Sequence, residues 1–222
     1  MRKNLFFWLF LFIFLTTYNF YLEKNVMSYF FGIKKIEIYG ISNFKKEKIE
    51  KKIDFLKGRN IIFISRDEFT GIIKEFNFVQ EFEIKKVYPN TIKLTIKESN
   101  PIGIFLHEEK KLVLLEGGKS TKHDQKKNFH FLPLVYGENA DKNFFIFYES
   151  LKDIDFQINL IKEFKYFETN RWDIILKDDK LIKLPSMNYK NALKEFLHIY
   201  KQDSFKKFKI FDFRVKGQLV IK

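Results

Sequence analysis

The 222-residue chain contains no cysteine and has only four histidines and four prolines. Without cysteine, disulfides and thiolate chemistry are excluded, and a zinc site would need histidine and carboxylate ligands. The histidines lack the spacing of a metal-binding pair, and no Gly-x-Ser-x-Gly nucleophile motif occurs. The sequence therefore predicts no catalytic, metal-binding or cofactor-binding residue, and we expect neither an enzyme nor a small-molecule substrate.

Large rings and positive charge are abundant instead. Phe accounts for 29 residues, and 41 Lys and Arg exceed 28 Asp and Glu, which gives a formal charge of +13. A basic excess can indicate nucleic-acid binding, but acidic residues are interleaved along nearly the whole chain. The most basic aromatic stretch, KKFKIFDFRVK at 206–216, alternates like a strand with two buried faces. We therefore expect no nucleic-acid partner.

A long apolar run near the N-terminus, LFFWLFLFIFLTTYNFYL at 5–22, carries no charge. As a helix it would be about 27 Å long at ~1.5 Å per residue, close to the ~30 Å hydrocarbon core of a bilayer. The sequence thus predicts a tail at 1–4, a transmembrane helix at 5–22 in contact with the lipid bilayer, and a linker at 23–32. Arg2 and Lys3 favour a cytoplasmic N-terminus. The alternative is a cleaved signal peptide, for which Val26-Met27-Ser28 loosely resembles a cleavage site.

Residues 33–100 predict a small sheet with two helices on one face, in the order β-α-α-β-β. IKKIEIYG at 33–40 is typical of a strand, and the next apolar residues recur at helical spacing, with Ser42 or Asn43 as the expected N-cap. Ser65 followed by Glu68 predicts a capping box at the start of a second helix. Two strands then flank a turn at Pro89-Asn90, and the alternation over 91–97 predicts one buried face.

Residues 101–222 predict a mainly antiparallel β domain with flanking helices. The clearest helix has apolar residues at amphipathic spacing over 189–200, and GGKSTKHDQKKN at 117–128 is typical of an exposed loop. KIFDFRV and GQLVIK predict two final strands. A terminal strand with a free edge exposes unpaired backbone groups and could accept a strand from a partner.

Several segments resemble the bacterial FtsQ/DivIB cell-division family. The most specific is FVQEFEIKKVYPNTIKLTIKESNPIG at 78–103, where the family has a strand, a basic residue, Tyr/Trp-Pro and an alternating strand that ends in Glu-x-x-Pro. LPLVYG, RWDIILKDDKLIKL and FDFRVKGQL resemble three later family segments. The EGG turn and the short spacing before Gly217 depart from the family pattern.

The resemblance implies an α+β fold with a single N-terminal transmembrane helix, a POTRA domain of β-α-α-β-β order at 33–100, and a C-terminal β domain at 101–222. It implies a non-enzymatic single-pass scaffold of the cell inner membrane, with periplasmic C-terminal domains, that acts at the division septum. The implied partners are FtsB and FtsL, with FtsB adding a strand to the last strand, and other divisome membrane proteins.

The implied partner-binding residues are Arg171, Arg214, Val215, Gly217, Gln218, Leu219 and Val220. The alternative function is that of a POTRA-containing envelope translocation or assembly factor. The long amphipathic helices after Pro101 disfavour it.

Overall fold

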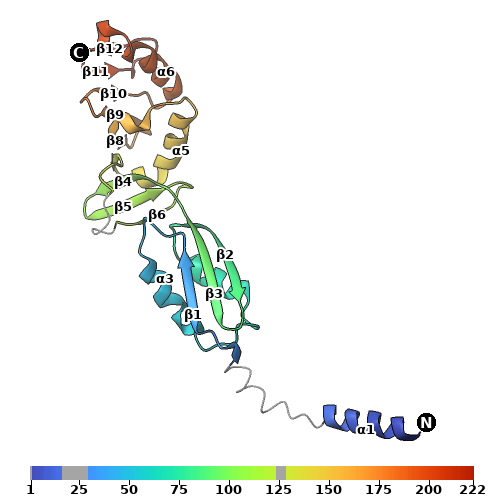
Figure 1. Cartoon of the computed structure of the whole chain (residues 1–222). Coiled ribbons are helices and arrows are strands. Elements are labelled where there is room, and N and C mark those ends of the chain that lie inside the picture. Colours follow the sequence, from blue (N-terminus) through green and yellow to red (C-terminus); the bar gives the residue numbers. More distant parts are fainter. Residues whose placement is uncertain (1, 17–29, 124–128) are drawn as a thin grey trace. The chain divides into compact units, whose positions relative to one another are not determined.

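The computed structural model describes residues 2–16, 30–123 and 129–222, and its contacts divide the chain into two compact units, 1–97 and 98–222 (Figure 1). Helix α1 covers Arg2–Thr16. Among the described residues, no helix combines the length and the apolar character needed to cross a membrane. Residues 17–22 of the predicted membrane helix and 23–29 of the predicted linker lie outside the described residues.

The first unit has a three-stranded sheet in the order β1-β3-β2, accompanied by two helices. Strand β1 runs parallel to β3. The predicted alternation is confirmed, because Ile92, Leu94 and Ile96 of β3 are all buried. The elements are β1 Lys35–Tyr39, α3 Lys46–Ile53, the 3-10 turn Asp54–Leu56, α4 Arg66–Ile73, β2 Val79–Val87 and β3 Thr91–Glu98.

The two helix starts differ in how well the sequence predicted them. The predicted capping box of α4 is confirmed: the Glu68 amide donates to Ser65 Oγ at 3.4 Å, and the Ser65 amide donates to Glu68 Oε1 at 3.2 Å. The predicted cap of α3 is wrong. Its N-cap residue is Lys45, whose side chain makes no capping bond, because the helix begins later than the Ser42-Asn43 pair allows.

Replacing Ser65 with alanine should destabilise the first unit modestly. The change removes one acceptor for the orphan amides of α4 and should lower the free energy of unfolding by about 1 kcal/mol. Thermal unfolding followed by circular dichroism measures the effect. Ser65→Asp keeps a capping oxygen and should retain most of the stability, so equal losses for both variants would contradict the capping role.

The second unit contains a nine-stranded sheet in the order β12-β11-β10-β9-β8-β7-β4-β5-β6. Antiparallel pairs predominate as predicted, but β4–β7, β7–β8 and β10–β11 are parallel. The elements are β4 Pro101–His107, β5 Lys110–Leu115, β6 Ser120–Lys122, β7 Leu134–Tyr136, α5 Ala140–Lys152, the 3-10 turn Ile158–Leu160, β8 Ile161–Phe167, β9 Arg171–Leu176, β10 Leu181–Lys183, α6 Tyr189–Tyr200, the 3-10 turn Asp203–Phe205, β11 Ile210–Asp212 and β12 Val220–Ile221.

Strand β6 corrects the sequence-based prediction of a loop at 117–128. Its three residues pair antiparallel with β5, with Val113 opposite Thr121. Polar residues can form an edge strand because only one side of such a strand needs a partner. Residues 124–128 of the same stretch lie outside the described residues.

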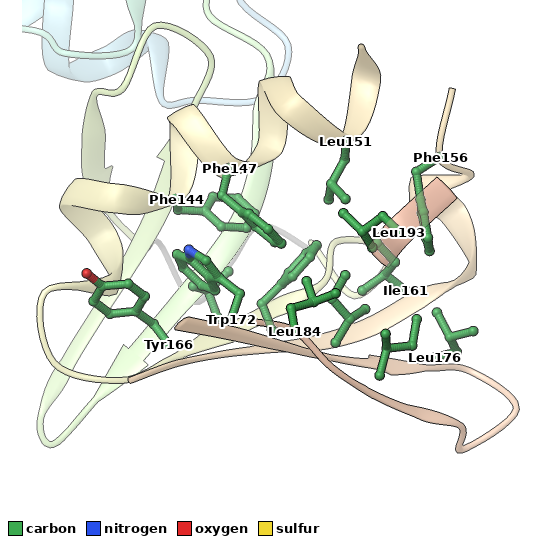
Figure 2. Packing of buried hydrophobic residues seen from close by; sticks show 14 of the residues in the cluster. Phe144, Phe147, Leu151, Phe156, Ile161, Tyr166, Trp172, Leu176, Leu184 and Leu193 are labelled. Atoms are coloured by element: carbon green, nitrogen blue, oxygen red, sulfur yellow. The ribbon is translucent and has the colours of Figure 1, made fainter. Parts of the chain in front are cut away.

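Helices α5 and α6 pack on the sheet through aromatic side chains, which form most of the core of the second unit (Figure 2). Phe147 of α5 stacks on Trp172 of β9 with ring centroids 4.9 Å apart. Phe196 of α6 meets Phe211 of β11 edge to face at 5.1 Å. Burying each such ring contributes roughly 2 kcal/mol or more, so this core holds the last strands in place.

Candidate functional site

Strand β12 lies at one edge of the large sheet. Its one neighbouring strand among the described residues is β11, with Phe211 opposite Ile221 and Asp212 opposite Val220. The sequence could not establish this position, which depends on the order of strands from across the whole unit. The structure therefore places the predicted template strand where one of its sides has no neighbouring strand in the described chain.

The ladder between β11 and β12 determines which backbone groups face outward. Ile210 and Lys222 exchange hydrogen bonds at 3.0 and 3.1 Å, so they form a hydrogen-bonded pair. Such pairs alternate with non-bonded pairs in antiparallel sheets, and the Phe211–Ile221 pair is non-bonded. The amide and carbonyl of Ile221 consequently point away from β11, toward the open edge, and those of Leu219, just before β12, follow the same alternation.

The side chains of the edge point to two different faces. Leu219 and Ile221 pack against the hydrophobic core, whereas Val220 is 42% exposed on the opposite face of the sheet. A strand added here would thus find a backbone supported from beneath by the core. Every second side chain of the added strand would lie beside Val220 on the outer face.

Five of the predicted binding residues lie outside the strands. The predicted strands at 209–215 and 217–222 are shorter in the structure, and the connection between β11 and β12 contains Arg214, Val215, Gly217, Gln218 and Leu219. The Gln218 amide donates to the Val215 carbonyl at 3.1 Å, and Gly217 has φ of +73°. This turn requires a left-handed residue at its third position, which glycine adopts without strain.

The Arg214 side chain is held by a neighbouring carboxylate. Its Nε donates to Asp212 Oδ1 at 2.8 Å and to Oδ2 at 3.0 Å, and its Nη2 donates to Oδ2 at 2.6 Å. These bonds lower the pKa of Asp212 below its ordinary value. The Arg214 side chain remains 44% exposed, so its guanidinium is oriented by the fold but accessible.

Arg171 is held by Asp173 of β9 and by Phe167 at the end of β8. Its guanidinium carbon lies 4.1 Å from the ring centroid of Phe167, and its Nε lies 3.4 Å from Asp173 Oδ1. Arg171 Nε and Asp173 Oδ1 are both buried, and neither atom makes a well-formed hydrogen bond to the described residues. Burial raises the pKa of Asp173, an effect that Arg171 partly opposes. The pair is thus closely packed but incompletely satisfied.

The sheet register brings the two arginines to one face. Asp173 lies opposite Lys183, and Lys183 lies opposite Asp212, so these three form a row across β9, β10 and β11. Arg171 precedes Asp173 by two residues and Arg214 follows Asp212 by two, and both arginines act electrostatically on Asp173. The row connects the predicted residue on β9 with those at the edge.

A groove of about 550 Å³ adjoins the connection between β11 and β12. Its walls are the loop before α6, the first turns of α6 and residues 213–218. Met187 on the loop is 77% exposed and Val215 on the opposite wall is 54% exposed. The groove could therefore accept an apolar side chain from a segment that approaches the edge.

Sequence reasoning missed Asp212, Met187 and the outward-facing backbone of Ile221. Asp212 could have been found, because residues two apart on a strand share a face and opposite charges there form pairs. No local signal identifies Met187 as a wall of the groove, since α6 is what brings it near residues 213–218. Among the described residues, no three histidine or carboxylate side chains converge as metal ligands.

Two family models match the chain. The model described as "POTRA domain, FtsQ-type" matches residues 31–99. The model described as "Cell division protein FtsQ/DivIB, C-terminal" matches residues 106–214. Together they span most of the chain, and the turn and strand at 215–222 follow the second match.

Curated relatives point the same way. The chain is similar to the cell division protein FtsQ of Rhizobium meliloti (strain 1021), at 23% identity over 163 residues covering 73% of this chain and 53% of the relative. It is 27% identical to FtsQ of Rickettsia conorii (strain ATCC VR-613 / Malish 7) over 194 residues, which cover 86% of this chain and 72% of the relative. The chain spans about half the length of the Rhizobium relative.

Part of the chain aligns with a solved structure. The major extracytoplasmic domain of the cell division protein DivIB of Geobacillus stearothermophilus aligns with a TM-score of 0.34 and 15% identity. The alignment covers 46% of this chain and 92% of the solved domain.

Proposed function

The chain belongs to the FtsQ/DivIB family of bacterial cell division proteins, and from this premise we propose that it is a non-enzymatic scaffold that captures the FtsB–FtsL pair at the edge of β12. A segment of FtsB would extend the sheet by one strand. The scaffold would thereby link early and late division proteins at the septum, in contact with other membrane proteins of the divisome.

The observation that carries this proposal is the open side of β12. The outward amides and carbonyls of Leu219 and Ile221 can donate to and accept from an incoming strand, and such backbone bonds supply affinity in strand addition. The core beneath Leu219 and Ile221 fixes the template in place. The adjoining groove can select the side chain that precedes or follows the added strand.

Charge supports the choice of an acidic partner segment. Asp212 uses Nε and Nη2 of Arg214, and Nη1 forms no hydrogen bond to the described residues, so it can bind a carboxylate from the partner. Arg171 lies on the same face of the sheet. Its side chain is 21% exposed, so an acidic side chain of the partner could approach the exposed part of the guanidinium.

Attachment to the inner membrane through residues 5–22 is part of the same proposal. The described portion, α1, exposes its large apolar side chains, with Phe6 76% and Phe12 68% exposed. Water solvates such a surface poorly, whereas a lipid bilayer would cover it. The basic residues before it favour a cytoplasmic N-terminus, which would leave the two folded units in the periplasm.

Co-purification tests the proposed function with the full chain. Detergent extracts of cells that express the chain with FtsB and FtsL should yield all three proteins when the chain carries the affinity tag. A tagged, unrelated membrane protein serves as the control for non-specific recovery. Recovery of FtsB and FtsL no greater than with that control would contradict the proposal.

A further inference from the structure

One end of the first unit exposes four large apolar side chains. Phe63 is 76% exposed, Phe30 59%, Tyr88 58% and Ile62 39%. We call this set, Phe30, Ile62, Phe63 and Tyr88, the basal patch. The two residues that flank the central pair, Ile61 and Ile64, are buried in the core, so the backbone of this loop is well anchored while its middle is directed outward.

Backbone contacts bring the three segments of the basal patch together. The Ile61 amide donates to the Phe31 carbonyl at 2.8 Å, which places Ile62 and Phe63 near Phe30. The Lys34 amide donates to the Asn90 carbonyl at 2.9 Å, and Asn90 belongs to the turn that carries Tyr88. The start of β1, the end of β2 and the start of β3 all meet at this end of the unit (Figure 1).

Basic side chains lie near the patch. Lys86 donates from Nζ to the Ile62 carbonyl at 3.0 Å, so its charge lies beside the exposed pair. The basic residues in these segments outnumber the acidic ones. In residues 30–35, 54–68 and 85–91 the basic residues are Lys34, Lys35, Lys57, Arg59, Arg66, Lys85 and Lys86, and the acidic ones are Asp54, Asp67 and Glu68. Lys35 pairs with Glu37, Lys57 with Asp54 and Arg59 with Glu68. Aromatic rings with neighbouring lysines are the combination that settles at the interface of an anionic membrane.

The chain itself limits how far this end can lie from a membrane. Phe30 follows Leu22, the last residue of the apolar run, by eight Cα steps, which span at most about 29 Å. If residues 5–22 anchor the chain, as the proposed function holds, the basal patch is confined to a layer next to the bilayer surface. No such restriction requires the opposite end of β1 to approach lipid.

We propose that the basal patch rests on the surface of the anionic inner membrane, with its aromatic rings among the lipid headgroups and its lysines near the phosphates. The contact would fix the orientation of the first unit on the membrane. This inference rests on the proposed anchoring by residues 5–22 but is independent of partner capture at β12.

The absence of cysteine allows a direct test on the full chain, since an introduced cysteine is the sole labelling site. Phe63→Cys, Tyr39→Cys and Phe10→Cys would each carry an environment-sensitive fluorophore, in vesicles of phosphatidylcholine alone or mixed with phosphatidylglycerol. Position 39, at the far end of β1 and 48% exposed, is the matched control. Acrylamide, a neutral quencher, reports exposure of the label to water.

In mixed vesicles, quenching at position 63 should be several-fold weaker than quenching at position 39. Added salt should raise the quenching at position 63. Adding Tyr88→Asp to the Phe63→Cys chain should bring quenching close to that at position 39. Equal quenching at both positions, with position 10 protected, would overturn the inference while leaving the anchor intact. Strong quenching at position 10 would overturn both the membrane contact of the basal patch and the proposed anchor at residues 5–22. If position 63 became protected only after FtsB–FtsL was added, the basal patch would be a protein interface, and the inference of a membrane contact would be overturned.

Discussion

Replacing Arg214 with glutamate is expected to weaken capture of FtsB–FtsL by at least roughly 30-fold, or about 2 kcal/mol, while the second unit stays folded. The new carboxylate would repel both Asp212 and the acidic partner segment, and the guanidinium contact would be lost. The fold should tolerate the change, because a partly exposed ion pair contributes only about 1 kcal/mol or less. Titration of the purified full chain with FtsB–FtsL measures the affinity.

Lys194→Glu provides the matched control for this variant. It makes the same change of charge at an exposed position of α6 that does not line the groove. The control should bind within a factor of about two of the unmodified chain, since general charge effects at exposed sites are screened by salt. Similar losses in the two variants would show that Arg214 acts only through net charge.

Replacing Leu219 with proline should weaken capture by a comparable amount. Proline removes an amide that points to the open side of β12, so an incoming strand loses one ladder bond and leaves its own carbonyl unsatisfied. The expected cost is about 2 kcal/mol, or roughly 30-fold in affinity. The intramolecular ladder should survive, because β11 pairs with Val220 and Lys222 instead.

Leu219→Ala separates the backbone contribution from that of the side chain. Alanine keeps the outward amide but loses the contact with the core. It should lower the stability of the unit more than it lowers partner affinity. If alanine and proline weaken capture equally, the amide of Leu219 makes no bond to the partner.

Local chemistry explains which parts of the fold could be predicted from the sequence. The alternation over 91–97 and the Ser65–Glu68 capping box depend on near neighbours, and both are confirmed. Strand β6 was missed because its three residues, Ser-Thr-Lys, carry no apolar alternation and depend on β5 for their pairing. The three parallel pairs of the second unit likewise join strands that are separated in the chain by a helix or by other strands.

The candidate site was only partly accessible to sequence reasoning. A family motif drew attention to Arg214 and the residues after it, but the exact ends of β11 and β12 follow from the turn at Gly217. Whether an arginine is accessible or held by a neighbour depends on the register of three strands, which placed Asp173, Lys183 and Asp212 in one row. Long-range order of this kind has no signature in a short segment.

Amide hydrogen exchange at Leu219 and Ile221, followed by NMR on the chain labelled with ¹⁵N-leucine and ¹⁵N-isoleucine, tests the central claim most directly. Both amides should exchange rapidly in the free chain, because they face the open edge, and slow markedly when FtsB–FtsL is added. Slow exchange at both amides before any partner is present, or rapid exchange that persists at saturation, would contradict strand addition at β12.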